Sequence, residues 1–307
     1  MLAEAITIGV FPLDQVRTPR PGAGTGWAAA LAGALPQLKA DAMPVALSVR
    51  FDPAQLVLAA KSGRHAIGSP LAIEPVPGAP LFLVRLGGKA FGVAFSSCAH
   101  PGLSPAANDR PADPAALAAF AAGTGIDTPD GPRAAQSLRP GDLVTTLANG
   151  SRPLAWVGRR QVSALELLGH PGLRPVGLAP GVAGNDRMLW LSPRQRLLID
   201  DWRAEVLFGE DRVLAPAEAL VNGDTVRQSV PPNGTEFVLL VCDRHEILLA
   251  DGALCESFHP GDSGLDGLTG ADRAALAQVI PEADLIRRRA AFPIVRGAEA
   301  RALRLPG

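Results

Sequence analysis

Short hydrophobic runs separated by Gly, Pro and Asn turns recur along most of this chain. In residues 1–112 the runs that read as strands are Val45–Phe51, Leu56–Ala60, Leu81–Leu86 and Ala90–Phe95. The pair Gly87-Gly88 stands between the last two runs and predicts a hairpin. Gly26–Leu35, followed by Pro36, is the one helix predicted here. The pattern therefore predicts a small β-rich N-terminal domain over residues 1–112.

Residues 113–262 show the same pattern and follow the proline-rich segment Ser104–Pro114, which reads as a linker. The predicted strands are Leu143–Leu147, Ala155–Val157, Arg187–Leu191, Arg196–Ile199, Glu205–Phe208, Phe237–Cys242, Ile247–Ala250 and Ala253–Phe258. Turn pairs such as Asn149-Gly150 and Asp251-Gly252 fall between them. Residues 168–184 read as a Gly/Pro-rich loop, and Pro216–Leu220 as a helical turn. Short strands at this spacing predict an all-β body.

The pattern becomes helical in residues 263–307. Thr269 precedes an apolar-periodic stretch that Pro281 interrupts, and Glu282–Ala291 is a second predicted helix. The triplet Arg287–Arg289 is predicted to lie on a solvated helix face. A helical tail is therefore expected after the β body.

Composition and charge exclude several classes of protein. Apolar residues make up 47% of the chain and charged residues 19%, which is typical of a globular protein. The formal net charge of −1 gives no basic field for nucleic acid or for an anionic membrane. No apolar run reaches the roughly 18 residues of a membrane helix. We expect a soluble protein, either cytoplasmic or exported by a signal not visible at the N-terminus.

The cysteines do not suggest a disulfide or metal framework. Cys98, Cys242 and Cys255 are odd in number and lack a CxxC spacing, so free thiols are predicted. Cys98-Ala99-His100 places a thiol near an imidazole, but no third group that would orient them is evident, so we interpret it as a strand end. No cofactor and no metal are predicted from these residues.

Three motifs in the β body carry the main functional information. The first begins at Ala119-Phe120, continues through Gly123-Thr124 and reaches a Pro129-Asp130-Gly131 turn. The second is Leu191–Leu197, with Ser192 at its start and Gln195 three residues later. The third is Asp243–Phe258, in which His245 is followed by a strand, an Asp-Gly turn and a second strand that ends at Glu256-Ser257.

Together these motifs resemble those of a Hint (hedgehog/intein) domain. In such domains a cysteine just before the Phe attacks the preceding carbonyl group, and a Thr-x-x-His motif supplies a general acid. The resemblance implies that Ala119 occupies the nucleophile position and Gln195 the position of the acid. Hedgehog domains carry a catalytic cysteine near the position of Ser257. Inteins end the same strand with His-Asn, where this chain has Glu256-Ser257. The resemblance thus implies a mainly β Hint fold whose processing residues are substituted.

Three functions remain open from the sequence. The first is a degenerate Hint protein that neither cleaves nor splices itself and is retained as a scaffold or binding module for an unknown protein partner. The second is autoprocessing at the Ala118–Ala119 bond without a cysteine at position 119, by a route in which His245 and Ser257 or Cys255 take over the chemistry. The third is a ligand- or protein-binding module that acts through residues 1–112.

The third motif also permits a metal or acid–base cluster, because Asp243, His245, Glu246, Glu256 and His259 lie close in the sequence. A zinc site requires three or four converging ligands, and the sequence shows only proximity. We therefore interpret His245 as a structural histidine that is hydrogen-bonded across the hairpin.

Overall fold

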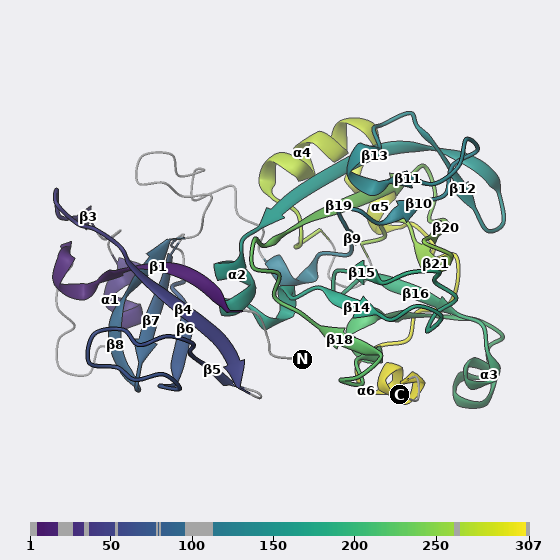
Figure 1. The fold of residues 1–307 in the computed structure, drawn as a ribbon. Coiled ribbons are helices and arrows are strands. Elements are labelled where there is room, and N and C mark those ends of the chain that lie inside the picture. Colours follow the sequence, from purple (N-terminus) through teal and green to yellow (C-terminus); the bar gives the residue numbers. More distant parts are fainter. Residues whose placement is uncertain are drawn as a thin grey trace. The chain divides into compact units, whose positions relative to one another are not determined.

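The computed structural model describes residues 5–17, 27–33, 37–52, 55–77, 79, 81–95, 113–260 and 265–304. These residues form a mainly β protein with short helices near its C-terminus, as the hydrophobic pattern predicted (Figure 1). The chain packs as two compact units. The first contains Met1–Asn108 together with Ser163–Pro171 and Pro231–Gly234. The second contains Asp109–Val162, Gly172–Val230 and Thr235–Gly307.

The first unit is built on a six-stranded antiparallel sheet with the order β5-β4-β1-β8-β7-β6. Its strands are β1 (Ile6–Pro12), β4 (Val45–Asp52), β5 (Gln55–Leu58), β6 (Leu71–Pro75), β7 (Leu81–Leu86) and β8 (Lys89–Phe95). A smaller ladder joins β2 (Val16–Arg17) and β3 (Gln37–Leu38). The hairpin predicted between β7 and β8 is confirmed, because Gly87 and Gly88 both have positive φ, at 58° and 78°.

Two helices from distant parts of the chain also belong to the first unit. Helix α1 (Trp27–Gly33) lies where the sequence predicted a helix, and its Leu31 is fully buried in the core of this unit. Helix α2 (Ala164–Gly169) comes from much later in the chain and packs on β6. A capping box between Ser163 and Glu166 starts it, with Glu166 N–H donating to Ser163 Oγ at 3.2 Å. The sequence analysis missed α2, because six residues are too few to show a helical period.

The second unit contains a 13-stranded antiparallel sheet system in which one path runs β17-β16-β21-β20-β12-β13-β19-β9-β15-β14-β18. Its strands are β9 (Phe120–Ala121), β10 (Gly125–Ile126), β11 (Arg133–Ala134), β12 (Leu143–Thr146), β13 (Gly150–Val162), β14 (Val176–Leu178), β15 (Leu189–Leu191), β16 (Arg196–Ile199), β17 (Val213–Pro216), β18 (Val226–Gln228), β19 (Thr235–Cys242), β20 (Ile247–Ala250) and β21 (Ala253–Glu256). Strands β13 and β19 pair from Leu154 opposite Cys242 to Val162 opposite Thr235.

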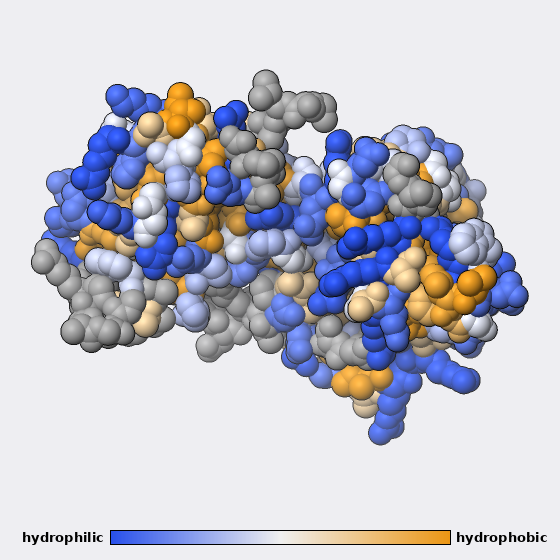
Figure 2. Space-filling model, turned by 90° about the horizontal axis from the view of Figure 1, so that it is seen from below, coloured by the Kyte–Doolittle hydropathy of each residue, from blue (hydrophilic) through white to orange (hydrophobic). Residues whose placement is uncertain are grey.

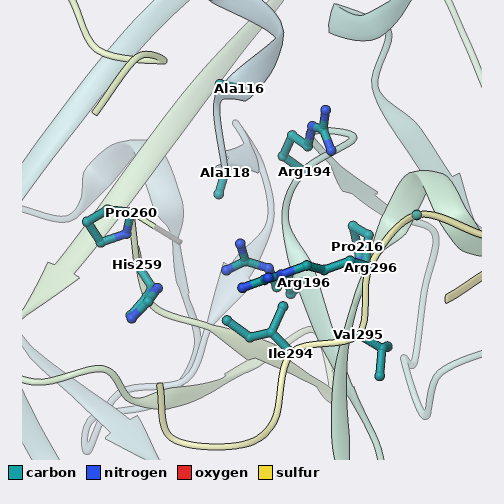
Figure 3. Close-up of a pocket in the computed structure, with 11 residues that line it drawn as sticks. Ala116, Ala118, Arg194, Arg196, Pro216, His259, Pro260, Ile294, Val295 and Arg296 are labelled. Atoms are coloured by element: carbon teal, nitrogen blue, oxygen red, sulfur yellow. The ribbon is translucent and has the colours of Figure 1, made fainter. Parts of the chain in front are cut away.

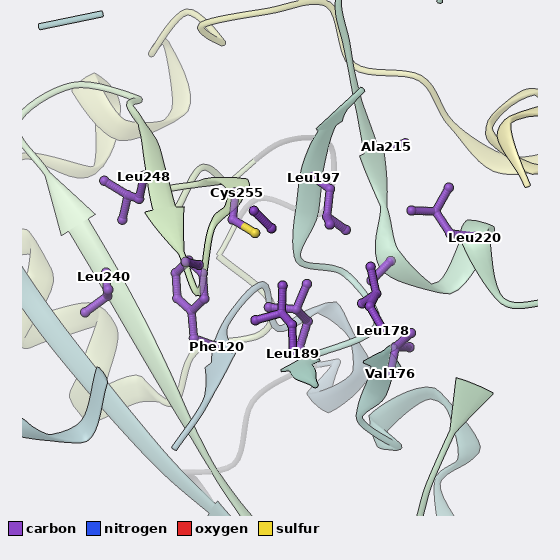
Figure 4. Packing of buried hydrophobic residues seen from close by; sticks show 14 of the residues in the cluster. Phe120, Val176, Leu178, Leu189, Leu197, Ala215, Leu220, Leu240, Leu248 and Cys255 are labelled. Carbon is purple, nitrogen blue, oxygen red and sulfur yellow. The ribbon is translucent and has the colours of Figure 1, made fainter. Parts of the chain in front are cut away.

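Apolar side chains from distant strands fill the centre of this unit (Figure 4). Phe120 is buried there, and Leu240, Leu248 and Cys255 belong to the same cluster. Burying apolar area at about 25 cal/mol per Å² is the main stabilising contribution in such a core. The core therefore fixes the strand ends that carry the first and third sequence motifs.

Two predictions for this unit were wrong. Glu205–Phe208 is not a strand but the end of helix α3 (Trp202–Phe208). Local capping decides this, since the Asp201 side chain accepts a hydrogen bond from Arg203 N–H at 2.9 Å and Gly209 ends the helix at a φ of 69°. Residues 168–184 are not only loop, because they include β14, whose three residues are buried between β15 and β18.

The C-terminal tail is helical, as predicted, but its middle part is extended. It contains α4 (Gly270–Val279), α5 (Glu282–Ile286), α6 (Gly297–Ala300) and a 3₁₀ turn (Arg301–Leu303). The helix predicted to reach Ala291 ends at Ile286. Beyond it the chain runs parallel to β17, with Leu214 N–H donating to Pro293 O at 2.8 Å and Val295 N–H donating to Leu214 O at 3.0 Å. Residues beyond Ile286 therefore make hydrogen bonds to β17 in place of the hydrogen bonds of a longer helix.

The surface is mixed in character. Figure 2 shows one face of the molecule, where hydrophobic residues form separate patches within a mainly hydrophilic surface. Helix α3 contributes exposed apolar side chains, and Trp202 and Val206 are each 69% exposed. Among the helices of the described ranges, none has the length and hydropathy that would let it cross a bilayer.

Candidate functional site

Strand pairing places the first and second motifs opposite each other. Phe120 of β9 pairs with Leu191 of β15 in an antiparallel register. Ala119 comes just before β9 and Ser192 just after β15, so these two residues also lie opposite one another. The backbone N–H of Ser192 donates to Ala119 O at 2.9 Å. The pairing thus brings together two residues that are 73 positions apart.

The hydroxyl group of Ser192 binds the backbone on both sides of Ala118. It accepts a hydrogen bond from Ala119 N–H at 2.8 Å and donates one to Leu117 O at 2.7 Å. Ser192 is 1% exposed and Ala119 is fully buried. Buried polar groups are costly when unpaired, so this serine stabilises the path of residues 117–119.

Position 119 carries only a methyl group in this closed environment. A methyl group cannot attack a carbonyl or hold an acyl group, whatever surrounds it. Ser192 Oγ lies in the direction of the Ala119 N–H bond, whereas a nucleophile approaches a carbonyl carbon from above or below the peptide plane. The nearest hydroxyl group is therefore oriented as a hydrogen-bond partner of this peptide.

Gln195 lies at the turn into β16 and is 1% exposed. Its side chain Nε2 donates to the backbone carbonyl of Glu256 at 2.7 Å. A glutamine amide donates and accepts hydrogen bonds but does not exchange a proton near neutral pH. Gln195 consequently links β16 to the end of β21 and cannot replace a histidine as a general acid.

The third motif forms the β20–β21 hairpin. Its turn is Asp251-Gly252, both with positive φ, at 48° and 89°, as a two-residue hairpin turn requires. The Asp251 carboxylate accepts from Gly125 N–H at 3.0 Å, which connects the turn to β10. The register places Ile247 opposite Glu256, so the residues before β20 lie beside those after β21.

His245 is held at both ring nitrogens. Nδ1 accepts a hydrogen bond from Ala291 N–H at 2.9 Å, and Nε2 lies 3.1 Å from Glu256 Oε2. A backbone N–H can only donate, so Nδ1 carries the lone pair and Nε2 carries the hydrogen that is donated to Glu256. The partner of His245 therefore lies across the hairpin, and the C-terminal tail supplies the second contact.

Glu256 is the centre of this polar cluster. Its carboxylate receives Arg196 Nη1 at 3.0 and 2.8 Å as well as His245 Nε2, and its side chain is fully buried. A buried carboxylate is tolerated only when it is paired and hydrogen-bonded. Glu256 thus connects β16, the β20–β21 hairpin and, through His245, the tail.

Ser257 and the two described cysteines are enclosed. Ser257 Oγ accepts from Glu246 N–H at 2.9 Å and Ser257 is fully buried. Burial, together with the negative charges of Glu246 and Asp243, raises the pKa of the Cys242 thiol to about 12. Burial also raises the pKa of Cys255, which is part of the core. Nucleophilic cysteines act as thiolates, and these environments oppose that state.

The predicted site residues are only partly brought together. Ala119 contacts Ser192, while Gln195 and His245 meet at Glu256. In the described part of the chain, no hydrogen bond joins Ala119 to His245 or Ser257. Within the same part, no three His, Cys, Asp or Glu side chains converge as metal ligands. Cys98 and His100 lie outside the described residues.

A cavity of about 140 Å³ lies beside Ala118 (Figure 3). Ala116 and Ala118 form part of its wall, and the charged lining comes from Arg194, Arg196 and Arg296. His259 also lines it, and its ring lies 4.6 Å from that of His245. Sequence reasoning missed this cavity, although Arg194 and Arg196 flank Gln195 in the second motif. Arg296 joins them only through the extended tail.

The tail makes a second set of contacts that the sequence did not predict. Arg288 lies beyond α5, and its guanidinium donates to Cys242 O at 3.0 Å and to Asp243 O at 2.9 Å. The prediction of a solvated helix face for Arg287–Arg289 is therefore wrong at Arg288. The carbonyl of Arg288 in turn accepts from His259 Nε2 at 3.0 Å.

Comparison with known proteins bears on residues 118–262. The Hint domain family model matches residues 118–262. Among curated proteins, the comparison found no match. Among solved structures, the chain is similar to a bacterial intein-like domain from Clostridium thermocellum, whose structure was determined in solution. The identity is 14%, the alignment covers 46% of this chain and 99% of that chain, and the TM-score is 0.34. The family match supports a Hint domain over residues 118–262 of this mainly β chain, as the three sequence motifs predicted.

Proposed function

We propose that this Hint domain does not process its own chain and that it serves as a scaffold or binding module. In this proposal the bond between Ala118 and Ala119 is a permanent link between the Hint domain and the residues before it. We also propose that the chain divides into domains over residues 1–112, 113–262 and 263–307.

The fully buried methyl group of Ala119 carries the proposal. The position that must form the first thioester or ester has no nucleophile, and the adjacent amide N–H is already bound to Ser192. When the peptide bond breaks, the nitrogen of residue 119 must gain a proton from a general acid. Gln195 stands at the position of that acid, but its Nε2 donates a hydrogen bond to Glu256 O. The nucleophile position 119 and the acid position 195 are thus both occupied by residues whose contacts stabilise the fold.

The rival function, autoprocessing through His245 with Ser257 or Cys255, has less support. Both nitrogens of His245 are hydrogen-bonded, and Ser257 Oγ accepts a bond from the backbone of Glu246. Cys255 is fully buried and has a raised pKa. A nucleophile for the Ala118 carbonyl would have to leave these contacts before it could react.

Intact-mass measurement of the purified full chain tests the proposal. We expect one unchanged mass over several days, with and without dithiothreitol. Dithiothreitol is the better probe because hydroxylamine also cleaves Asn–Gly bonds, and the chain contains Asn149-Gly150, Asn222-Gly223 and Asn233-Gly234. A fragment whose N-terminus is Ala119 would overturn the proposal.

Restoring the missing groups provides the reciprocal test. The double variant Ala119→Cys with Gln195→His is expected to release a fragment beginning at residue 119 in dithiothreitol. Matched controls are Ala119→Cys alone, which lacks the acid, and Ala119→Ser with Gln195→His, which lacks the thiol. Cleavage in the double variant above both controls would show that only these groups are missing, whereas equal cleavage in wild type would contradict the proposal.

A further inference from the structure

Three arginines from two distant parts of the second unit line one small cavity, which we call the arginine pocket. Arg194 and Arg196 come from the turn after β15 and the start of β16, and Arg296 comes from the tail just before α6. In Figure 3 the side chains of Arg196 and Arg296 extend into the centre of the view, between Ala118 and Ile294. No carboxylate is among the eleven described residues that line the pocket.

Two of these arginines already pair with carboxylates that are not part of the pocket lining. Arg194 Nη1 lies 3.0 Å from Glu218 Oε1, and Arg196 Nη1 binds Glu256. A guanidinium group has five N–H donors. Among the described residues, Nε and Nη2 of Arg196 have no hydrogen-bond partner. The pocket thus has unused donors on a cation whose side chain is only 15% exposed.

The donors of Arg196 that Glu256 does not use favour an anionic group in the cavity. Arginine is the side chain best suited to this role, because its planar donors match the oxygens of a carboxylate or a phosphate. The cavity of about 140 Å³ is smaller than the roughly 300–1,000 Å³ of a typical small-molecule site. Its size therefore favours a compact anionic group.

We propose that the arginine pocket binds a compact oxyanion, either a phosphate or a carboxylate group. Arg196 and Arg296 donate to its oxygens, with Arg194 at the rim. The occupant contacts Ala118 on one side and the tail at Val295–Gly297 on the other. This binding is independent of whether the Ala118–Ala119 bond is cleaved, so it extends beyond the function proposed above.

Thermal unfolding of the full chain tests the proposal directly. The melting temperature is measured against increasing sodium phosphate and, separately, sodium acetate, with sodium chloride used to hold the ionic strength constant. A ligand that binds only the folded state raises stability in proportion to RT ln(1 + [L]/Kd). With at least one of the two anions we expect a rise that becomes linear in the logarithm of the anion concentration above Kd, and with chloride alone we expect none.

Charge-removing variants locate the site. Arg296→Gln is expected to weaken binding about 10-fold, as the loss of one charge-assisted hydrogen bond predicts. Arg194→Gln is a second variant, because its side chain is about half exposed and its loss leaves the core intact. Arg287→Gln is the matched control, since Arg287 is exposed on the same tail and is not among the residues that line the pocket.

The outcomes separate the possible ligands. A response to phosphate alone assigns a phosphate group, and a response to acetate alone assigns a carboxylate. No response to either anion overturns the proposal, as does an equal response in wild type, Arg296→Gln and Arg194→Gln. Because the readout is binding, it is unaffected by the mass measurement that tests for cleavage.

Discussion

Ser192 Oγ lies 2.8 Å from the amide nitrogen of Ala119 and accepts its hydrogen bond. The same hydroxyl group donates to Leu117 O, so it bridges the segment that contains the Ala118–Ala119 bond. Antiparallel pairing of β9 with β15 produces this arrangement. A residue at a processing-motif position thus has a structural role that can be measured by itself.

Ser192→Ala is expected to destabilise the protein by about 2 kcal/mol or more, because it leaves a buried N–H and a buried carbonyl unpaired. Urea unfolding measures this free energy. Ser192→Thr keeps the hydroxyl group and should retain most of the stability. Ser137→Ala is a matched control, since the exposed Ser137 hydroxyl makes one bond to Ala134 O and its loss should cost less than about 0.5 kcal/mol. Equal losses at both serines would contradict the buried role.

Glu256→Gln is expected to cost about 3 kcal/mol or more, because it leaves Arg196 without its buried counter-charge. The comparison is Glu282→Gln, which removes an exposed pair with Arg273 and should cost less than about 1 kcal/mol. Both free energies come from urea unfolding at neutral pH. A small effect at Glu256 would show that this carboxylate does not organise the polar cluster.

Gly177→Ala should destabilise the sheet by about 1–3 kcal/mol through overpacking. Gly177 of β14 pairs with Trp190 of β15, and an added Cβ would lie 2.5 Å from Trp190 Cζ3. The control is Gly9→Ala in β1, where the new Cβ would meet Pro44 Cβ at an ordinary 3.6 Å. Thermal unfolding of both variants checks the prediction, and a milder effect at Gly177 than at Gly9 would refute it.

Stability should fall as the pH is lowered through about 6.5, in part because of His259. Burial lowers the pKa of His259 below 6.5, and the neighbouring His245 and Arg196 act in the same direction, although the Arg288 carbonyl and Glu256 act in the opposite one. Between its lowered pKa and 6.5 the unfolded chain therefore binds more protons than the folded one, so acidification favours unfolding. A single proton gives a slope of at most about 1.4 kcal/mol per pH unit.

Chemical denaturation between pH 8 and pH 5 measures that slope. His259→Gln should reduce it, whereas His65→Gln, in the N-terminal unit, is the control for general histidine effects. An unchanged slope in His259→Gln would contradict the assignment.

The two described cysteines should resist a thiol reagent in the folded protein. Cys242 and Cys255 are fully buried and have raised pKa values. In a Cys98→Ser variant, Ellman's reagent is expected to react with both only as fast as the protein unfolds. Rapid reaction of either thiol without unfolding would restore support for a thiol-based processing route.

Much of the fold followed from local patterns. β7 and β8 were predicted from apolar runs joined by Gly87-Gly88, and the β20–β21 hairpin from the Asp251-Gly252 turn. Helix α3 was mistaken for a strand because four residues, Glu205–Phe208, do not distinguish the two periods. The capping residues Asp201 and Gly209, which flank the helix, are the sequence signal that indicates it. Strand β14 was missed because three apolar residues within a Gly/Pro-rich segment give no period at all.

The sequence by itself determined what two motif positions cannot do: a methyl group at 119 and an amide at 195 cannot act as nucleophile and acid in any fold. Only the tertiary structure decided what these positions do instead. The pairing of Glu256 with Arg196 joins residues 60 positions apart, and Ala291 reaches His245 across 46. Such contacts depend on strand register and on the path of the tail, which are set by burial of the whole core and not by any local run of residues. The arginine pocket beside Ala118 likewise depends on the tail, which supplies Arg296 and its neighbours to the lining.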